Sequence, residues 1–175
     1  MQIREASIDD AENIKNVHLQ AFDSSEARMV SDFAVNLLNE NHPVKIFSLV
    51  AIENSEIVGH VAFSPVYLEN TNEHLGYILA PLAVSPEFQK NSIGTSLVKY
   101  GLDTLSNIGS FIVFVYGDPK YYSRFGFKTD LAKNFIPPYT LQFPKGWHAL
   151  KLNSSVFAEG GKITCVHSLN DPSLW

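Results

Sequence analysis

The chain has 175 residues, of which 45% are hydrophobic and 18% charged, so it is long enough and apolar enough to bury one globular core. Its formal net charge of −5 excludes a general attraction to nucleic acid, and its longest apolar run is too short to span a membrane. Cys165 is the only cysteine, which excludes an internal disulfide and favours a reducing compartment. No apolar signal-peptide core follows Arg4, so we expect a single cytoplasmic domain over residues 1–175.

The N-terminal third shows helical spacing of apolar residues first and strand-like runs later. Ser7 is a typical helix N-cap, and Ile14, Val17 and Ala21 belong to the apolar stripe of the helix that follows. A tight turn at residues 54–56 separates two strand-like runs. The elements expected here are a strand at 3–5, a helix from Ser7 to about Phe22, a helix at 25–38, and strands at 48–53 and 57–66.

The middle of the chain carries a strand, a loop and a helix in immediate succession. Ile78–Val84 is a short apolar run typical of a buried strand, Glu87–Ser92 is polar, and apolar residues recur at helical spacing from Ile93. A strand followed by a short loop and a helix points several free backbone N–H groups at one spot. Lys90 adds a positive charge and Gly94 permits close approach, so this connection is suited to bind a phosphate group.

A second strand and a short helix are expected about thirty residues later. Phe111–Tyr116 is a continuous apolar run, and Asp118 followed by Pro119 is a good helix start. Gly126 would end that helix in the left-handed conformation. After a proline-containing loop, residues 147–152 and 162–166 are expected to form closing strands, so the fold class is mixed α/β.

These two segments resemble known acetyltransferase motifs. Leu82-Ala83-Val84-x-Pro86 with Gln89-x-x-Ser92-Ile93-Gly94 resembles the acetyl-CoA-binding motif of the GNAT superfamily of N-acetyltransferases, usually written [QR]xxGx[GA]. Ser92 stands where the first glycine is usual. Residues 117–127, GDPKYYSRFGF, resemble the family's FYxKxGF ending, and in particular a branch of bacterial N-acetyltransferases with GDPxYYxRFGF. The resemblance implies a twisted, mostly antiparallel central sheet flanked by helices.

The same resemblance implies roles for individual residues. The Leu82 amide would polarise the acetyl carbonyl, the main chains of Leu82 and Val84 would pair with the pantetheine arm, and Tyr122 would protonate the departing CoA sulfur. Acetyl-CoA is the only cofactor implied, without a metal. The residues that the resemblance assigns to acetyl-CoA are Leu82, Ala83, Val84, Gln89, Lys90, Asn91, Ser92, Ile93, Gly94, Thr95, Asp118 and Tyr122.

Two classes of function remain after this comparison. The first is an N-acetyltransferase that moves an acetyl group from acetyl-CoA to a primary amine, on a small molecule or a peptide, by direct transfer through a ternary complex. The second is a CoA-binding sensor or scaffold without turnover, and a tyrosine at position 122 favours the enzyme. We expect neither a nucleic-acid nor a membrane partner, and a homodimer is one alternative for the assembly. The sequence does not identify the acceptor amine.

The general base is not identified by the resemblance either. Ile78 stands where some family members carry a glutamate, so Glu73, His74 or Glu53 remain as alternatives, directly or through a water. The family's acceptor pocket is walled by its first two helices, which makes His18, Phe22 and Glu26 candidates to touch substrate. The alternative is that Phe22 is core and the other two are solvated. His60, in the second strand of the predicted pair, is expected to be a satisfied polar residue.

Other chemistries find no pattern in the sequence. The six histidines show no HxxxH or Cys–His spacing that would hold a metal, and there is no GxSxG nucleophile elbow. Cys165 lies in an apolar run, where a buried structural role is expected.

Overall fold

The computed structural model describes residues 1–154 and 160–175, and the chain divides into two compact units. Unit 1 contains Met1–Phe63 and Ala80–Gly101, and unit 2 contains Ser64–Leu79 and Leu102–Trp175. The strands are β1 (Gln2–Glu5), β2 (Phe47–Glu53), β3 (Glu56–Leu68), β4 (Glu73–Val84), β5 (Ile112–Tyr116), β6 (Phe135–Ile136), β7 (Trp147–Lys151) and β8 (Gly161–Cys165). The α-helices are α1 (Ala11–Ala21), α2 (Ser24–Asn39), α3 (Ile93–Asn107), α4 (Pro119–Tyr122) and α5 (Thr129–Ala132).

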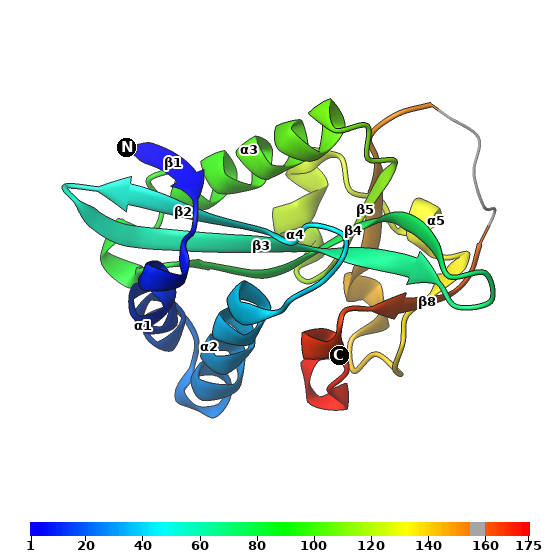
Figure 1. Cartoon of the computed structure of the whole chain (residues 1–175), viewed down its shortest axis with the longest axis horizontal. Coiled ribbons are helices and arrows are strands. Elements are labelled where there is room, and N and C mark those ends of the chain that lie inside the picture. The colour runs from blue at the N-terminus through cyan, green and yellow to red at the C-terminus, as the bar shows by residue number, and fades with distance from the viewer. Residues whose placement is uncertain (155–159) are drawn as a thin grey trace. The chain divides into compact units, whose positions relative to one another are not determined.

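The strands pair in the order β1-β2-β3-β4-β5-β7, and β8 pairs with both β3 and β6. Within unit 1, β2 and β3 lie side by side (Figure 1). The pairs β1–β2, β2–β3, β3–β8 and β5–β7 are antiparallel, whereas β4–β5 and β6–β8 are parallel. The fold is therefore mixed α/β with a mostly antiparallel central sheet flanked by helices, which confirms the expected fold class.

In unit 1, α1 and α2 pack on one face of the β2–β3 pair and α3 packs on the other. Val50 of β2 clusters with Ile14 of α1 and Ala34 of α2, all fully buried. On the opposite face a Cβ at Gly59 of β3 would lie 3.0 Å from Leu97 of α3, so this glycine lets the helix approach the sheet closely. Alternation of side chains along each strand produces this two-sided burial.

In unit 2, β5 lies between β4 and β7 and carries the centre of an aromatic core. Phe114 of β5 stacks on Trp147 of β7, with ring centroids 5.2 Å apart, and meets Phe135 edge-on. Trp175 lies beside Trp147 and donates its indole N–H to the Leu169 carbonyl at 3.0 Å. The C-terminal residue is thereby packed into the core of this unit.

The observed elements match most of the expected ones and differ at several boundaries. The second helix begins at Ser24 and ends at Asn39, one residue longer at each end than expected. Strand β4 begins at Glu73, before the apolar run Ile78–Val84 that predicted it, because the hairpin with β3 needs only a short connection. The segment after Phe127 also contains α5 and β6, which are too short to give a periodic signal. In the part of the chain that the structure describes, no helix has the length and apolarity needed to cross a bilayer.

Candidate cofactor-binding and catalytic residues

The connection between β4 and α3 contains two residues in the left-handed region of backbone conformation. A short 3₁₀ turn, Pro86–Phe88, leads into the loop, where Lys90 has φ 65° and Ser92 has φ 63°. Left-handed residues alternating with right-handed ones turn successive N–H groups toward one side, and such concavities bind anions. The conformation at Ser92 also explains why a glycine is usual at this place in the motif, since glycine adopts it without cost.

Helix α3 begins directly after Ser92 and presents its first turn to the loop. The first hydrogen bond of the helix runs from the Ser96 N–H to the Ser92 carbonyl at 2.9 Å. The amides of Ile93, Gly94 and Thr95 therefore precede the helical ladder and have no acceptor within it. Together with the exposed Lys90 and the positive end of the helix dipole, these amides form a setting that favours a phosphate group.

The side chain of Gln89 joins the loop to the end of β4. Its side-chain amide donates to the carbonyl of Val84 at 3.0 Å, across five residues. The carbonyl of Val84 is therefore already engaged, although the main chains of Leu82 and Val84 were both predicted to pair with the pantetheine arm. Ala83 is buried, Leu82 is half-buried and Asn91 is exposed. The four β4 residues that pair with β5, 76–79, precede this segment.

In unit 2, Asp118 begins α4 in the predicted way. Its Oδ1 accepts the Lys120 N–H at 2.9 Å, and Pro119 occupies the first helical position. A 3₁₀ turn, Ser123–Phe125, continues the helix, and Gly126 ends it in the left-handed conformation with φ 92°. Asp118 thus has an evident structural use as the helix cap, whereas its assignment to the cofactor stays a prediction.

Tyr122 lies at the end of α4 in a largely apolar surrounding. Its ring meets Tyr121 edge-on at 5.0 Å and Phe127 at 5.9 Å. A Cβ at Gly117 would lie 2.5 Å from the Tyr122 ring, so the glycine is needed for this placement. Burial, helped by Tyr121 and Asp118, raises the pKa of Tyr122 well above its ordinary value. The phenol therefore keeps its proton at neutral pH, and its hydroxyl has no hydrogen-bond partner among the described residues.

A buried polar chain that the sequence did not predict lies beneath α1. His18 Nε2 is 2.8 Å from His60 Nδ1, and His60 Nε2 is 2.8 Å from Ser48 Oγ. Both imidazoles are completely buried, so the expectation that His18 is solvated is wrong, while the expectation that His60 is satisfied is confirmed. Burial lowers the pKa of His18 to about 3 and that of His60 well below its ordinary value. His18 shares the apolar stripe of Ile14 and Val17, and that position was the available signal.

The remaining candidates for substrate contact and for the general base are scattered. Phe22 is half-buried and stacks on His18, with centroids 6.0 Å apart, whereas Glu26 is exposed. Glu53 forms an ion pair of 3.1 Å with the N-terminal amine. Strand β4 contains the exposed Glu73, the buried Ile78 and His74. The ring centroid of His74 lies 5.4 Å from those of Tyr67 and Tyr77. Within residues 1–154 and 160–175, no group of three histidine, cysteine or acidic residues is placed to hold a metal ion.

Comparison with known proteins gives consistent matches. Residues 11–127 match the family described as "Acetyltransferase (GNAT) family". The chain is 31% identical over 161 residues to the uncharacterized N-acetyltransferase YjhQ of Escherichia coli, covering 90% of this chain and 87% of that one. It is 35% identical over 121 residues to the uncharacterized N-acetyltransferase YhbS of the same species, covering 68% of each. The crystal structure of E. coli YhbS in complex with CoA superposes with TM-score 0.82 at 26% identity, covering 97% of this chain and 92% of that one. An acetyltransferase from Brucella melitensis in complex with acetyl-CoA gives TM-score 0.77 at 26% identity, covering 97% of each chain.

Proposed function

Because the chain belongs to the GNAT acetyltransferase family, we propose that it transfers the acetyl group of acetyl-CoA directly to a primary amine in a ternary complex. The observation that carries this proposal is the family match over residues 11–127, which includes both the β4–α3 loop and Tyr122. Relatives crystallised with CoA and with acetyl-CoA support the same donor.

The β4–α3 loop has the features that a pyrophosphate group needs. Left-handed backbone at Lys90 and Ser92 and the free first-turn amides of α3 provide donors without a competing internal acceptor. We assign the pyrophosphate to this loop, with Gln89 holding the loop's shape through Val84. Lys90 contributes the one positive side chain among the loop residues 89–95.

The chemistry requires a stabilised oxyanion and a proton for the leaving thiolate. The Leu82 amide is assigned to the oxyanion, an assignment that rests on the family motif. Tyr122 is assigned to the thiolate, since its raised pKa keeps the phenol protonated at neutral pH, so that its hydroxyl holds a proton to donate. The acetyl-CoA thioester supplies an activated acyl group, so no covalent enzyme intermediate is needed.

The acceptor amine must be neutral when it attacks. A lysine-like amine has a pKa of about 10.4 and requires a base, whereas a weakly basic amine does not. Glu73 and His74 are exposed and Glu53 is ion-paired. We assign the proton of the amine to one of these three side chains, which accepts it directly or through a water.

The proposal is tested in two steps with the whole chain. Acetyl-CoA at about a hundred times its dissociation constant should stabilise the fold by roughly 2.7 kcal/mol, measured by thermal unfolding. A panel of amine acceptors is then incubated with acetyl-CoA, and released thiol is recorded against reactions without acceptor. Binding with acceptor-dependent thiol release supports an enzyme. Binding without release for any amine would leave a CoA-binding module, and no binding would refute both.

A further inference from the structure

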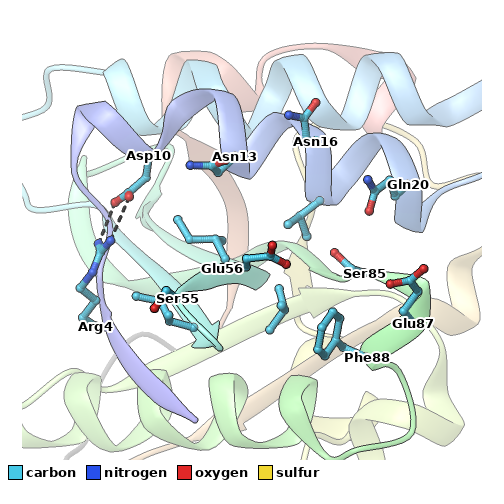
Figure 2. A pocket seen from close by; sticks show the side chains of 14 residues that line it. Arg4, Asp10, Asn13, Asn16, Gln20, Ser55, Glu56, Ser85, Glu87 and Phe88 are labelled. Atoms are coloured by element: carbon cyan, nitrogen blue, oxygen red, sulfur yellow. Dashed lines mark hydrogen bonds and ion pairs between the residues drawn. The ribbon is translucent and has the colours of Figure 1, made fainter.

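A polar groove in unit 1 lies outside the residues assigned to acetyl-CoA. It has a volume of about 450 Å³ and is lined by α1, by the β2–β3 turn and by the 3₁₀ turn that precedes the phosphate loop. Figure 2 shows Asn13, Asn16 and Gln20 of α1 along one side, with Glu56 and Glu87 along the other. The lining contains none of residues 89–95, so this groove is separate from the phosphate loop.

The three carboxamides on α1 form one row. Asn13, Asn16 and Gln20 are spaced by three and four residues, which places them on one face of the helix. The side-chain amides of these three residues make no hydrogen bond to one another or to any other described residue. Each can therefore offer both a donor and an acceptor to a ligand in the groove.

The positive charge of the groove is already used. Arg4 binds Asp10 through two hydrogen bonds, of 2.7 and 2.9 Å, and also donates to the Glu5 carbonyl. This guanidinium lowers the pKa of Asp10 to about 2, so the pair stays ionised and mutually neutralised. Among the described residues that line the groove, no cation is consequently left to hold an anionic ligand.

The negative charges, in contrast, are free. The carboxylates of Glu56 and Glu87 have neither an ion-pair nor a hydrogen-bond partner in the part of the chain that the structure describes. They come from separate elements, the start of β3 and the 3₁₀ turn. The groove thus carries two uncompensated carboxylates, in a chain whose net charge is already −5.

The groove also has apolar lining residues. They are Val17, Ile52, Ile57, Val58 and Phe88. An elongated ligand with a positive group at each end and methylenes between them would match both the charges and this lining.

We propose that this groove binds a small aliphatic diamine, with its ammonium groups at Glu56 and Glu87 and its methylenes over the apolar lining. The α1 carboxamides accept the remaining ammonium hydrogens. This site is independent of the acetyl-transfer reaction and does not require it.

The test uses a diamine under conditions in which it cannot be acetylated. The probe is 1,4-diaminobutane, which keeps two positive charges and three hydrogens on each nitrogen at neutral pH and is not acetylated because no acetyl-CoA is added. It is titrated into the whole chain by calorimetry at low ionic strength, with 1,4-butanediol as the neutral control. Saturable binding of the diamine and none of the diol is expected. An absence of diamine binding at millimolar concentration would overturn the proposal.

Variants locate the site. Glu56→Gln and Glu87→Gln should each weaken diamine binding about three- to ten-fold, since exposed charge pairs contribute modestly. Glu12→Gln is the matched control, because Glu12 is an exposed glutamate on α1 outside the groove lining. It removes the same charge and should leave binding unchanged. Equal weakening in all three variants would show that the diamine is attracted only by the overall negative charge of the chain. An unchanged affinity in the Glu56/Glu87 double variant would show that the diamine binds elsewhere. Either result would refute the assignment.

Discussion

The side-chain amide of Gln89 donates to the main-chain carbonyl of Val84 at 3.0 Å, and so ties the start of the phosphate loop to the end of β4. The Ser85 N–H in turn donates to the Val58 carbonyl on β3 at 2.9 Å. The loop is therefore anchored to the sheet immediately before its two left-handed residues, Lys90 and Ser92. A glutamine at this position of the motif has a structural use beyond any direct contact with a phosphate group.

Gln89→Ala should weaken acetyl-CoA binding while leaving the fold almost unchanged. The lost hydrogen bond is worth about 0.5–1.5 kcal/mol, which corresponds to an affinity loss of roughly two- to ten-fold if its whole effect is to preorganise the loop. Calorimetric titration of acetyl-CoA measures the change. Gln89→Glu is the sharper comparison, because a carboxylate cannot donate to the Val84 carbonyl and would repel a bound phosphate. Tighter binding in Gln89→Glu than in Gln89→Ala would show that repulsion is absent and that the phosphate lies elsewhere.

Gly94→Glu should abolish measurable acetyl-CoA binding, since it places a carboxylate at the first turn of α3 against the proposed pyrophosphate. The fold should survive, because Gly94 is only half-buried. Gly94→Ala adds a Cβ without charge and separates bulk from repulsion. Titration of each variant with acetyl-CoA is the measurement, and parent-like affinity in Gly94→Glu would exclude this loop as the phosphate site.

The buried pair His18 and His60 should make the folded state sensitive to mild acid. Both pKa values are lower in the folded state than the ordinary 6.5, that of His18 being about 3. Below about pH 6.5 these histidines therefore bind protons in the unfolded chain but not in the folded chain. The stability of the fold falls as the pH drops through this range. Each such histidine should cost about 1.4 kcal/mol of unfolding free energy per pH unit in that range. Urea unfolding between pH 7 and pH 4.5 measures this slope.

His18→Gln tests the origin of the acid sensitivity. Glutamine keeps a hydrogen-bonding group near His60 but does not titrate, so the slope should become shallower. His167→Gln, at an exposed histidine, should leave the slope as it is. The ion pair of Asp10 with Arg4 acts in a lower range, because a lowered carboxylate pKa contributes stability that is lost only as the pH falls from about 3.8 toward 2. An unchanged slope in His18→Gln would exclude the histidine pair as its cause.

The parts of the fold that the sequence predicted are those with local causes. The strand before Pro86, the helix from Ile93, and the cap formed by Asp118 and Pro119 each follow from neighbouring residues. The turn between β2 and β3 was placed for the same reason, and its residues Asn54 and Ser55 both have positive φ.

What the sequence did not predict depends on contacts between distant residues. His18 and His60 are 42 residues apart in the chain, and nothing in either neighbourhood indicates that they bond. The left-handed conformation at Lys90 has no glycine to signal it. The groove beside α1 is lined by residues of several separate elements, and its charge balance appears only once Arg4 is seen to be held by Asp10.

Tyr122→Phe should lower turnover by roughly 10²–10⁴-fold if Tyr122 is the general acid, because phenylalanine keeps the ring but has no proton to give. Acetyl-CoA affinity should hardly move, since the lost interaction matters mainly as thiolate charge develops. Fold stability should also be preserved, as the contacts of the ring with Tyr121 and Phe127 remain. Steady-state thiol release gives turnover, and calorimetry gives the affinity.

Tyr121→Phe is the control for Tyr122→Phe. Tyr121 is its neighbour on α4, and its ring packs against Phe125 and the Arg124 guanidinium, contacts that phenylalanine preserves. Turnover should therefore stay close to that of the parent. Equal losses in the two variants would indicate packing damage in place of acid catalysis. Full activity in Tyr122→Phe would mean that water protonates the thiolate, and a loss of acetyl-CoA affinity without a loss of turnover at saturation would make Tyr122 a binding residue.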